Sequence, residues 1–240
     1  ASCVAQEHVI LLHGLCRTSR SMAGMASALR RAGYRVWNID YPSRTASIEQ
    51  LGEHAIGEAL TACRRDGATR VHFVTHSLGG ILVRSYLARH AVPELGRVVM
   101  LAPPNQGSEV VDRLGAWKLF ALINGPAGRE LGTAPSSTPS LLGPATFQVG
   151  VIAGTRSVNW INSCLIPGAD DGKVSVERTR LAGMGDHIVI KATHPFIMNH
   201  REARRQTLHF LQHGAFARGP AAGTWFMRLC AQTVSASTVG

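Results

Sequence analysis

The sequence contains a serine, an acidic pair and a histidine in an order that could support acyl transfer. Ser77 comes directly after the apolar run Arg70–His76, and His194 comes directly after the run His187–Thr193. An acidic pair, Asp170-Asp171, lies between them in the chain. A serine activated by a histidine, which an acid orients in turn, is a device for nucleophilic catalysis. The spacing therefore predicts a covalent hydrolytic or transfer mechanism.

The surroundings of Ser77 favour a nucleophile on a sharp turn. In "FVTHSLGGI" the strand-like run stops at His76, and helical periodicity begins after the serine. Small neighbours allow a strand and a helix to approach closely, which exposes the serine Oγ above the sheet. The N–H of Leu78, the first helical residue, is then expected to face a developing oxyanion. The alternative is that Ser77 is only a helix N-cap.

A second oxyanion donor is predicted at the end of the first apolar run. His13-Gly14 closes the run His8–Leu15, and Gly14 permits a close backbone approach. We expect the N–H of Leu15 to join that of Leu78, while His13, Gly14 and His76 flank the donors and contact substrate. The alternative for Gly14 is an ordinary glycine that ends a strand.

The acid and the base each have a second candidate. Asp171 is preferred because Asp171 to Val174 returns the chain to the core directly after the carboxylate, and Asp170 remains the fallback. Asp-Gly is also a common turn pair. His194 is preferred as the base because it follows a strand, and His200, near the start of the last helix, is second.

The remaining chain alternates between strand and helix patterns. This rhythm predicts an α/β fold with a mostly parallel sheet of about six strands and helices on both faces. The predicted strands are His8–Leu15, Tyr34–Pro42, Arg70–His76, Gly96–Pro104, Phe147–Gly154 and His187–Thr193, and the predicted helices are Ser21–Arg31, Ile48–Arg65, Leu78–His90 and Arg201–Gly214.

The 240 residues fit one domain, residues 1–214, and leave an appendage at 215–240. Residues 105–146 form a long Gly/Pro/Ser-rich connection, which predicts either a surface excursion or a short cap or lid over the site.

The motifs "LLHGL", "THSLGG", "DDGKV" and "THPF", in this order, resemble the α/β-hydrolase superfamily and, within it, the small bacterial lipases and esterases. The resemblance covers His8–Gly214 and matches the chain order Ser77, Asp171, His194. One departure from this resemblance is Thr75. The strand-to-helix turn that carries the nucleophile often has its first glycine at this position, where relatives also have other small residues.

The resemblance implies a serine carboxylic-ester hydrolase, an esterase or lipase. It would cleave short- to medium-chain acyl esters through an acyl-enzyme, with no cofactor and no metal. Acyl transfer, thioester hydrolysis and amide hydrolysis use the same triad and stay open. A non-catalytic binding module is disfavoured because all three triad groups are present.

Charge and composition limit the partners. The formal charge is +10, but the arginine pairs are scattered rather than clustered with aromatic residues, which argues against nucleic-acid binding. The sequence has no run of 18 or more apolar residues, so no membrane span is predicted. The positive surface would still suit contact with an anionic interface. The five cysteines form no CxxC motif. We expect a small ester or lipid as the partner. Oligomeric state, acyl preference and compartment (cytoplasmic, or secreted after leader removal) stay open.

Overall fold

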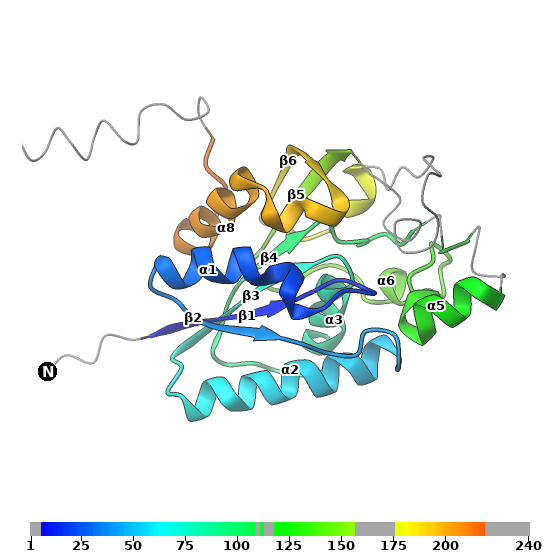
Figure 1. The fold of residues 1–240 in the computed structure, drawn as a ribbon, viewed down its shortest axis with the longest axis horizontal. Helices are drawn as coiled ribbons and strands as arrows, with labels where there is room; N and C mark the ends of the chain where they lie inside the picture. The colour runs from blue at the N-terminus through cyan, green and yellow to red at the C-terminus, as the bar shows by residue number, and fades with distance from the viewer. Residues whose placement is uncertain (1–5, 109–110, 113–117, 157–175, 219–240) are drawn as a thin grey trace, which may run out of the picture.

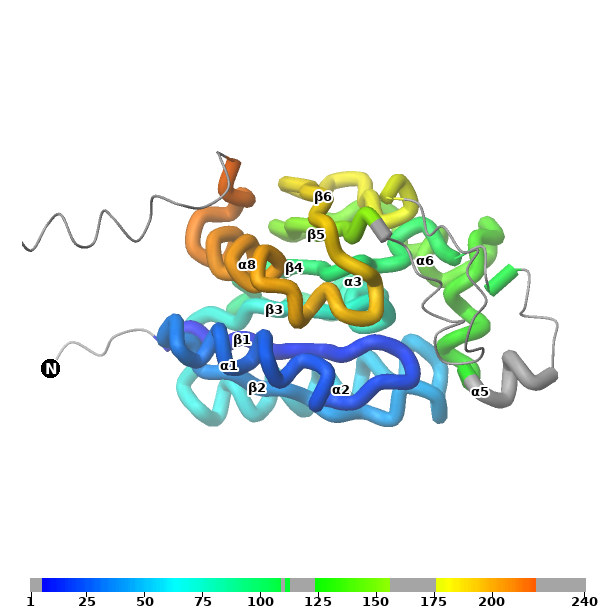
Figure 2. Tube along the Cα trace, turned by 45° about the horizontal axis from the view of Figure 1, so that its top comes forward, coloured from blue at the N-terminus to red at the C-terminus, as the bar shows by residue number. Residues whose placement is uncertain are grey.

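A computed structural model describes residues 6–108, 111–112, 118–156 and 176–218 of the chain. Its centre is a parallel sheet with the strand order β2-β1-β3-β4-β5-β6, which Figure 2 shows edge to edge. The strands are β1 (Glu7–Leu12), β2 (Arg35–Ile39), β3 (Arg70–His76), β4 (Leu95–Leu101), β5 (Val149–Arg156) and β6 (Asp186–Thr193). The predicted parallel sheet of six strands is confirmed, with strand ends shifted by a few residues.

Helices cover both faces of the sheet, as predicted. Figure 1 shows α1 (Ala23–Arg31) and α8 (Arg201–His213) on one face, and α2 (Ile48–Arg65) and α3 (Leu78–Leu87) on the other. Because successive strand residues point to opposite faces, Ile10 packs with the α2–α3 core while Val9 and Leu11 pack with the α1–α8 core. The strands are therefore apolar on both sides, as buried parallel strands are. No described helix has the length and apolarity needed to cross a membrane.

The connection after β4 supplies two further helices, α5 (Lys118–Arg129) and α6 (Thr138–Leu141), which lie beyond the carboxyl ends of the strands (Figure 1). The helix α5 is kinked at Gly125, whose φ of 66° suits glycine, and Pro126 follows. A methyl group on Gly125 would overlap the carbonyl oxygen of Arg44. The close contact holds α5 against the loop between β2 and α2.

The short 3₁₀ helices η1 (Ser19–Met22), η2 (Val176–Thr179) and η3 (His194–Asn199) complete the described part of the chain. Beyond α8, the first residues of the predicted appendage pack on the domain. Phe216 is buried with its ring 4.9 Å from that of Phe210, and its N–H donates to Asp186 Oδ2 at 2.9 Å. Residues 219–240 lie outside the described residues.

Candidate active site

Ser77 occupies a strained turn between β3 and α3. Its φ of 51° and ψ of −117° place a non-glycine residue in a conformation that costs about 1–3 kcal/mol. Its N–H donates to Leu101 O at 2.9 Å, and its carbonyl accepts the N–H of Gly80 at 3.0 Å. Ser77 stands at the N-cap position of α3, but its side chain makes no cap hydrogen bond, so capping does not account for a serine there. Within the described residues, the buried Oγ has no hydrogen-bond partner.

Two glycines let the loop after β1 lie directly against this turn. A methyl group on Gly14 would lie 2.8 Å from His76 Nδ1 and 3.2 Å from Ser77 Cβ. A methyl group on Gly79 would lie 2.8 Å from Leu12 O and 3.0 Å from His13 O. The two distances of 2.8 Å are shorter than real Cβ atoms tolerate. The predicted juxtaposition of His13-Gly14 with Ser77 is therefore present.

The loop after β1 is held by the end of β2. Tyr41 Oη donates to His13 O at 2.5 Å, and the two rings stack with centroids 4.1 Å apart. His13 Nδ1–H donates to Gly14 O at 2.8 Å, while Nε2 accepts the N–H of Tyr41 at 3.3 Å. Ser43 Oγ accepts the N–H of Cys16 at 3.1 Å. His13 is fully buried, and its ring nitrogens are engaged by the backbone.

The two predicted oxyanion donors directly follow residues that the structure brings together, since Leu15 follows Gly14 and Leu78 follows Ser77. Leu15 lies in the loop just described, and Leu78 is the first residue of α3, where N–H groups lack intrahelical acceptors. In the described part of the chain, neither N–H donates to another backbone group. Both residues are buried, so an oxygen placed between them would be shielded from water.

His194 begins η3 directly after β6 and is joined to the Ser77 turn through His76. His76 Nε2–H donates to His194 O at 3.0 Å, and the two imidazole rings lie 5.0 Å apart. Both histidines are buried, with exposed fractions of 2% for His76 and 5% for His194. His76, which precedes Ser77, therefore ties the serine turn to the loop that carries the predicted base.

The second candidate base, His200, has another task. Its Nδ1 accepts the N–H of Glu202 at 3.2 Å and caps the N-terminus of α8. This capping accounts for a histidine at that position. Asp170 and Asp171, the two candidate acids, lie outside the described residues.

Burial keeps the candidate histidines neutral. It lowers the pKa of His76 to about 3, an effect that the hydrogen bond to His194 O partly opposes. Burial lowers the pKa of His194 well below 6.5, and the charges of His76 and Arg17 act in the same direction. A neutral imidazole can accept a proton, but the lowered pKa also makes His194 a weaker base, so catalysis would need a carboxylate partner that stabilises the imidazolium.

A buried arginine fastens the segment around α6 to α3, the helix that follows Ser77. Arg84 is 5% exposed and donates to oxygen atoms of three residues, namely Asn105 O (3.0 Å), Asn105 Oδ1 (3.2 Å), Pro139 O (3.1 Å) and Gly143 O (2.9 Å). Asn105 Nδ2 in turn donates to Thr179 O at 2.8 Å. The loop after β4, the segment around α6 and the end of η2 are thus joined through the side chains of Arg84 and Asn105.

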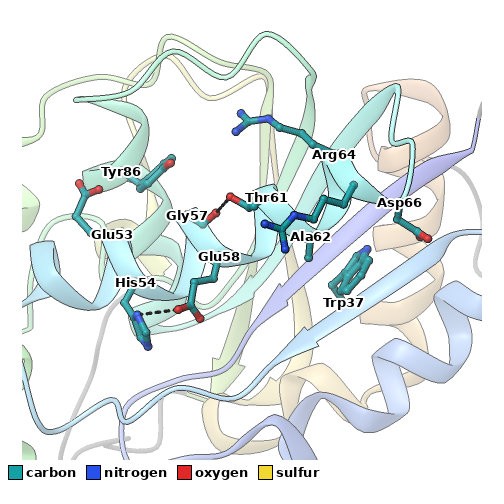
Figure 3. Close-up of a pocket in the computed structure, with 11 residues that line it drawn as sticks. Trp37, Glu53, His54, Gly57, Glu58, Thr61, Ala62, Arg64, Asp66 and Tyr86 are labelled. Atoms are coloured by element: carbon teal, nitrogen blue, oxygen red, sulfur yellow. Dashed lines mark hydrogen bonds and ion pairs between the residues drawn. The ribbon is translucent and has the colours of Figure 1, made fainter.

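Other features of the surface do not compete with this site. Figure 3 shows a depression along the solvent side of α2, between Trp37 and Tyr86, where His54 Nδ1 pairs with Glu58 Oε1 at 3.3 Å. None of the predicted site residues lines it. Among the described residues, no group of three His, Cys, Asp or Glu side chains is arranged to hold a metal ion.

The sequence interpretation missed Tyr41, Ser43 and Arg84. Tyr41 and Ser43 border Pro42, at the carboxyl end of the second predicted strand, where parallel sheets gather functional groups. Their position was therefore a usable signal. Arg84 gave no such signal, because its partners are carbonyl and amide oxygens rather than carboxylates.

Comparisons with known proteins agree with this architecture. The family described as the alpha/beta hydrolase fold matches residues 7–131, just over half of the chain. Triacylglycerol lipase from Pseudomonas fragi is 29% identical over 131 residues, which are 52% of this chain and 43% of that lipase. The chain thus spans less than half the length of this relative.

Two solved structures share the fold. The mature lipase BlEst2 of Bacillus licheniformis superposes with a TM-score of 0.64 and 21% identity, covering 88% of this chain and 93% of the lipase. A thermophilic esterase from Thermogutta terrifontis superposes with a TM-score of 0.54 and 13% identity, covering 87% and 90%. The resemblance seen in the sequence is confirmed, and the chain belongs to the α/β-hydrolase fold family.

Proposed function

We propose that this protein is a serine carboxylic-ester hydrolase of the esterase and lipase type, acting on short- to medium-chain acyl esters. The observation that carries the proposal is the strained, buried Ser77, whose Oγ forms no cap hydrogen bond although it stands at a helix N-terminus. Such a conformation persists only where surrounding structure enforces it, and it gathers at functional sites. Similarity to a triacylglycerol lipase supports the same reaction class.

In the proposed mechanism, neutral His194 removes the proton from Ser77 Oγ as the oxygen attacks the ester carbonyl. The N–H groups of Leu15 and Leu78 hold the resulting oxyanion, and each is worth about 10²–10³ in kcat. His194 then protonates the leaving alcohol, and water cleaves the acyl-enzyme by the reverse sequence.

Three supporting roles complete this mechanism. Asp171 is the proposed partner of the imidazolium, with Asp170 as the alternative. His13 and Gly14 shape the loop that carries the Leu15 donor. His76 positions the His194 loop through its hydrogen bond to His194 O.

The test is a series of p-nitrophenyl esters from acetate to dodecanoate, assayed on the wild type and on Ser77→Ala. We expect the wild type to prefer short to medium chains and the variant to lose about 10⁶-fold in kcat. Ser85→Ala is the matched control, because Ser85 is equally buried in α3 and its hydroxyl accepts from Arg89 Nη1 at 3.0 Å. A Ser77→Ala variant with wild-type turnover would exclude the mechanism.

The other roles have paired tests. His194→Ala should abolish turnover, while His200→Ala should chiefly lower stability by removing the cap of α8. Asp171→Asn is expected to cost about 10⁴-fold in kcat, and Asp170→Asn much less. If Asp170→Asn has the larger effect, Asp170 is the acid.

A further inference from the structure

A pocket of about 550 Å³ lies beside the candidate oxyanion loop, at the carboxyl ends of β1 and β2. One wall comes from the loop after β1 and the other from the loop after β2. Its lining residues are Cys16, Arg17, Thr18, Asp40, Tyr41, Pro42, Ser43, Arg44 and Thr45. Leu15, the proposed oxyanion donor, immediately precedes the first wall. The pocket therefore opens at the edge of the sheet where Ser77 lies.

Arg17 carries a positive charge between this pocket and the candidate histidines. Its side chain is half-buried, and its backbone N–H donates to Gly14 O at 3.2 Å, which fixes the residue relative to the oxyanion loop. Burial is the main cause of the lowered pKa of His76 and of His194, and the charge of Arg17 lowers the pKa of both further. Within the described residues, no carboxylate oxygen lies within 4.0 Å of its guanidinium.

The second wall adds another cation, and the one carboxylate in the pocket is engaged elsewhere. Arg44 enters from the loop after β2. Asp40 Oδ1 accepts the N–H of Ser19 at 2.8 Å and lies 3.5 Å from His13 Nε2. The lining of the pocket thus holds two arginines and one carboxylate, and the net charge of +10 adds long-range attraction for anions.

We propose that this pocket binds an anionic group of the ester substrate, a carboxylate or a phosphate, with Arg17 as its principal contact. Guanidinium groups suit this task because their planar fork donates two parallel hydrogen bonds to such anions. The inference rests on the proposed ester hydrolysis at Ser77, since it concerns which esters that site selects.

The test compares anionic esters with neutral esters of similar shape. On the acyl side, kcat/KM is measured for mono-p-nitrophenyl glutarate and p-nitrophenyl valerate. On the alcohol side, it is measured for dihexanoylglycerol 3-phosphate and dihexanoylglycerol. The proteins are the wild type, Arg17→Gln, Arg17→Lys and Arg65→Gln. Arg65 is the matched control because it is an exposed arginine in the last turn of α2, outside the lining of this pocket.

The readout is the ratio of anionic to neutral kcat/KM, in which any general effect on the chemistry cancels. Arg17→Gln should lower this ratio about tenfold for one of the two pairs, which corresponds to about 1.4 kcal/mol. Arg17→Lys should restore part of it, and Arg65→Gln should leave it unchanged. The pair that responds tells whether the anion belongs to the acyl or to the alcohol part.

Two results would overturn the inference in different ways. If the wild type cleaves the neutral esters but Arg17→Gln leaves both ratios unchanged, or lowers anionic and neutral turnover alike, Arg17 is no anion site. If the wild type cleaves none of the four esters, the proposed function itself is wrong, and the inferred anion site is refuted together with it.

Discussion

Gly79 and Gly80 are adjacent, yet replacing each by alanine should change the stability of the protein to very different extents. A methyl group on Gly79 would lie 2.8 Å from Leu12 O, 2.9 Å from Leu12 Cβ and 3.0 Å from His13 O. These atoms belong to β1 and the loop after it, and β1 is paired with β2 on one side and β3 on the other. The strand cannot yield, so α3 must move outward by several tenths of an ångström.

At Gly80 the same methyl group meets only side chains. Its nearest neighbours are Pro103 Cβ and Thr75 Oγ1 at 3.3 Å and Met100 Sδ at 3.4 Å. These distances are tight but can relax, and alanine is favoured over glycine in a helix by about 1 kcal/mol. Because Gly80 has no side chain, there is space beside the Thr75 hydroxyl, which explains how threonine fits at position 75.

The expected magnitudes follow from these contacts. Overpacking typically costs about 1–3 kcal/mol, so Gly79→Ala should be about 2 kcal/mol less stable than Gly80→Ala, which should be within about 1 kcal/mol of the wild type. At about 2–4 °C per kcal/mol for a chain of this size, the two melting temperatures should differ by roughly 4–8 °C. Displacement of the Leu78 N–H should also cost Gly79→Ala up to about 10² in kcat.

Thermal melting followed by circular dichroism measures the stability difference, and turnover of p-nitrophenyl butyrate measures the catalytic one. Equal melting temperatures for the two variants would refute the claim that the backbone of β1 limits the approach of α3. A destabilised Gly79→Ala variant with wild-type kcat would instead refute the role of Leu78 as an oxyanion donor.

Two further predictions concern buried charge. Acid should destabilise the protein, because burial lowers the pKa of six histidines, namely His8, His13, His72, His76, His187 and His194. Their stabilising contribution is complete above pH 6.5. It is lost as the pH falls below 6.5, because the unfolded chain then binds protons that the folded protein excludes. With a folded pKa of about 3, His76 alone should cost about 2 kcal/mol at pH 5. Urea unfolding at pH 7.5 and pH 5 tests this, and equal free energies of unfolding would contradict it. The free energy of unfolding of His76→Asn should fall less than that of the wild type between the two pH values. Replacing Arg84 by methionine should lower the free energy of unfolding by about 3 kcal/mol or more, since four oxygen atoms lose their donor and three of these hydrogen bonds are buried. Arg89→Met, just beyond the C-terminus of the same helix, should cost less than about 1 kcal/mol, because the ion pairs of Arg89 with Glu49 and Glu53 are exposed. Similar losses for the two arginines would show that Arg84 does not join these segments.

The sequence was sufficient to predict the parts that depend on periodicity. Apolar runs and helical stripes gave six strands and the two helical layers, and Ser77 and His194 follow from the rule that ligands gather at the carboxyl ends of parallel strands. Strand and helix ends were less accurate. The predicted helix from Leu78 to His90 ends at Leu87, and the helical pattern from Ser21 begins as the 3₁₀ helix η1.

The parts that escaped prediction depend on contacts between distant segments. Nothing in the residues around Tyr41 indicates that its hydroxyl donates to His13 O, 28 positions earlier in the chain. Arg84 is buried without a carboxylate, so no pattern of opposite charges marks it. Whether the Ser77 hydroxyl makes a cap hydrogen bond depended on the backbone angles of one residue, which residue types alone do not specify. The expectation that the Oγ is exposed above the sheet was wrong, because the Ser77 side chain is buried.

Backbone strain provides evidence for the site that is independent of any motif. Among the described residues other than glycine, positive φ occurs at Cys16, Ser77 and Ala102. These residues follow β1, β3 and β4, three neighbouring strands, at the same edge of the sheet. Positive φ is sterically unfavourable for cysteine, serine and alanine alike, so the residue types do not reveal the strain.

The three strained residues are held by hydrogen bonds to neighbouring segments. Ser43 Oγ accepts from Cys16 N–H, Leu101 O accepts from Ser77 N–H, and Ile152 O accepts from Ala102 N–H at 2.8 Å. Strain of about 1–3 kcal/mol per residue persists only where such contacts over-determine the backbone. The sheet edge is therefore rigid where a nucleophile and two oxyanion donors would need fixed positions, and this rigidity favours catalysis at Ser77 over a binding role that tolerates movement.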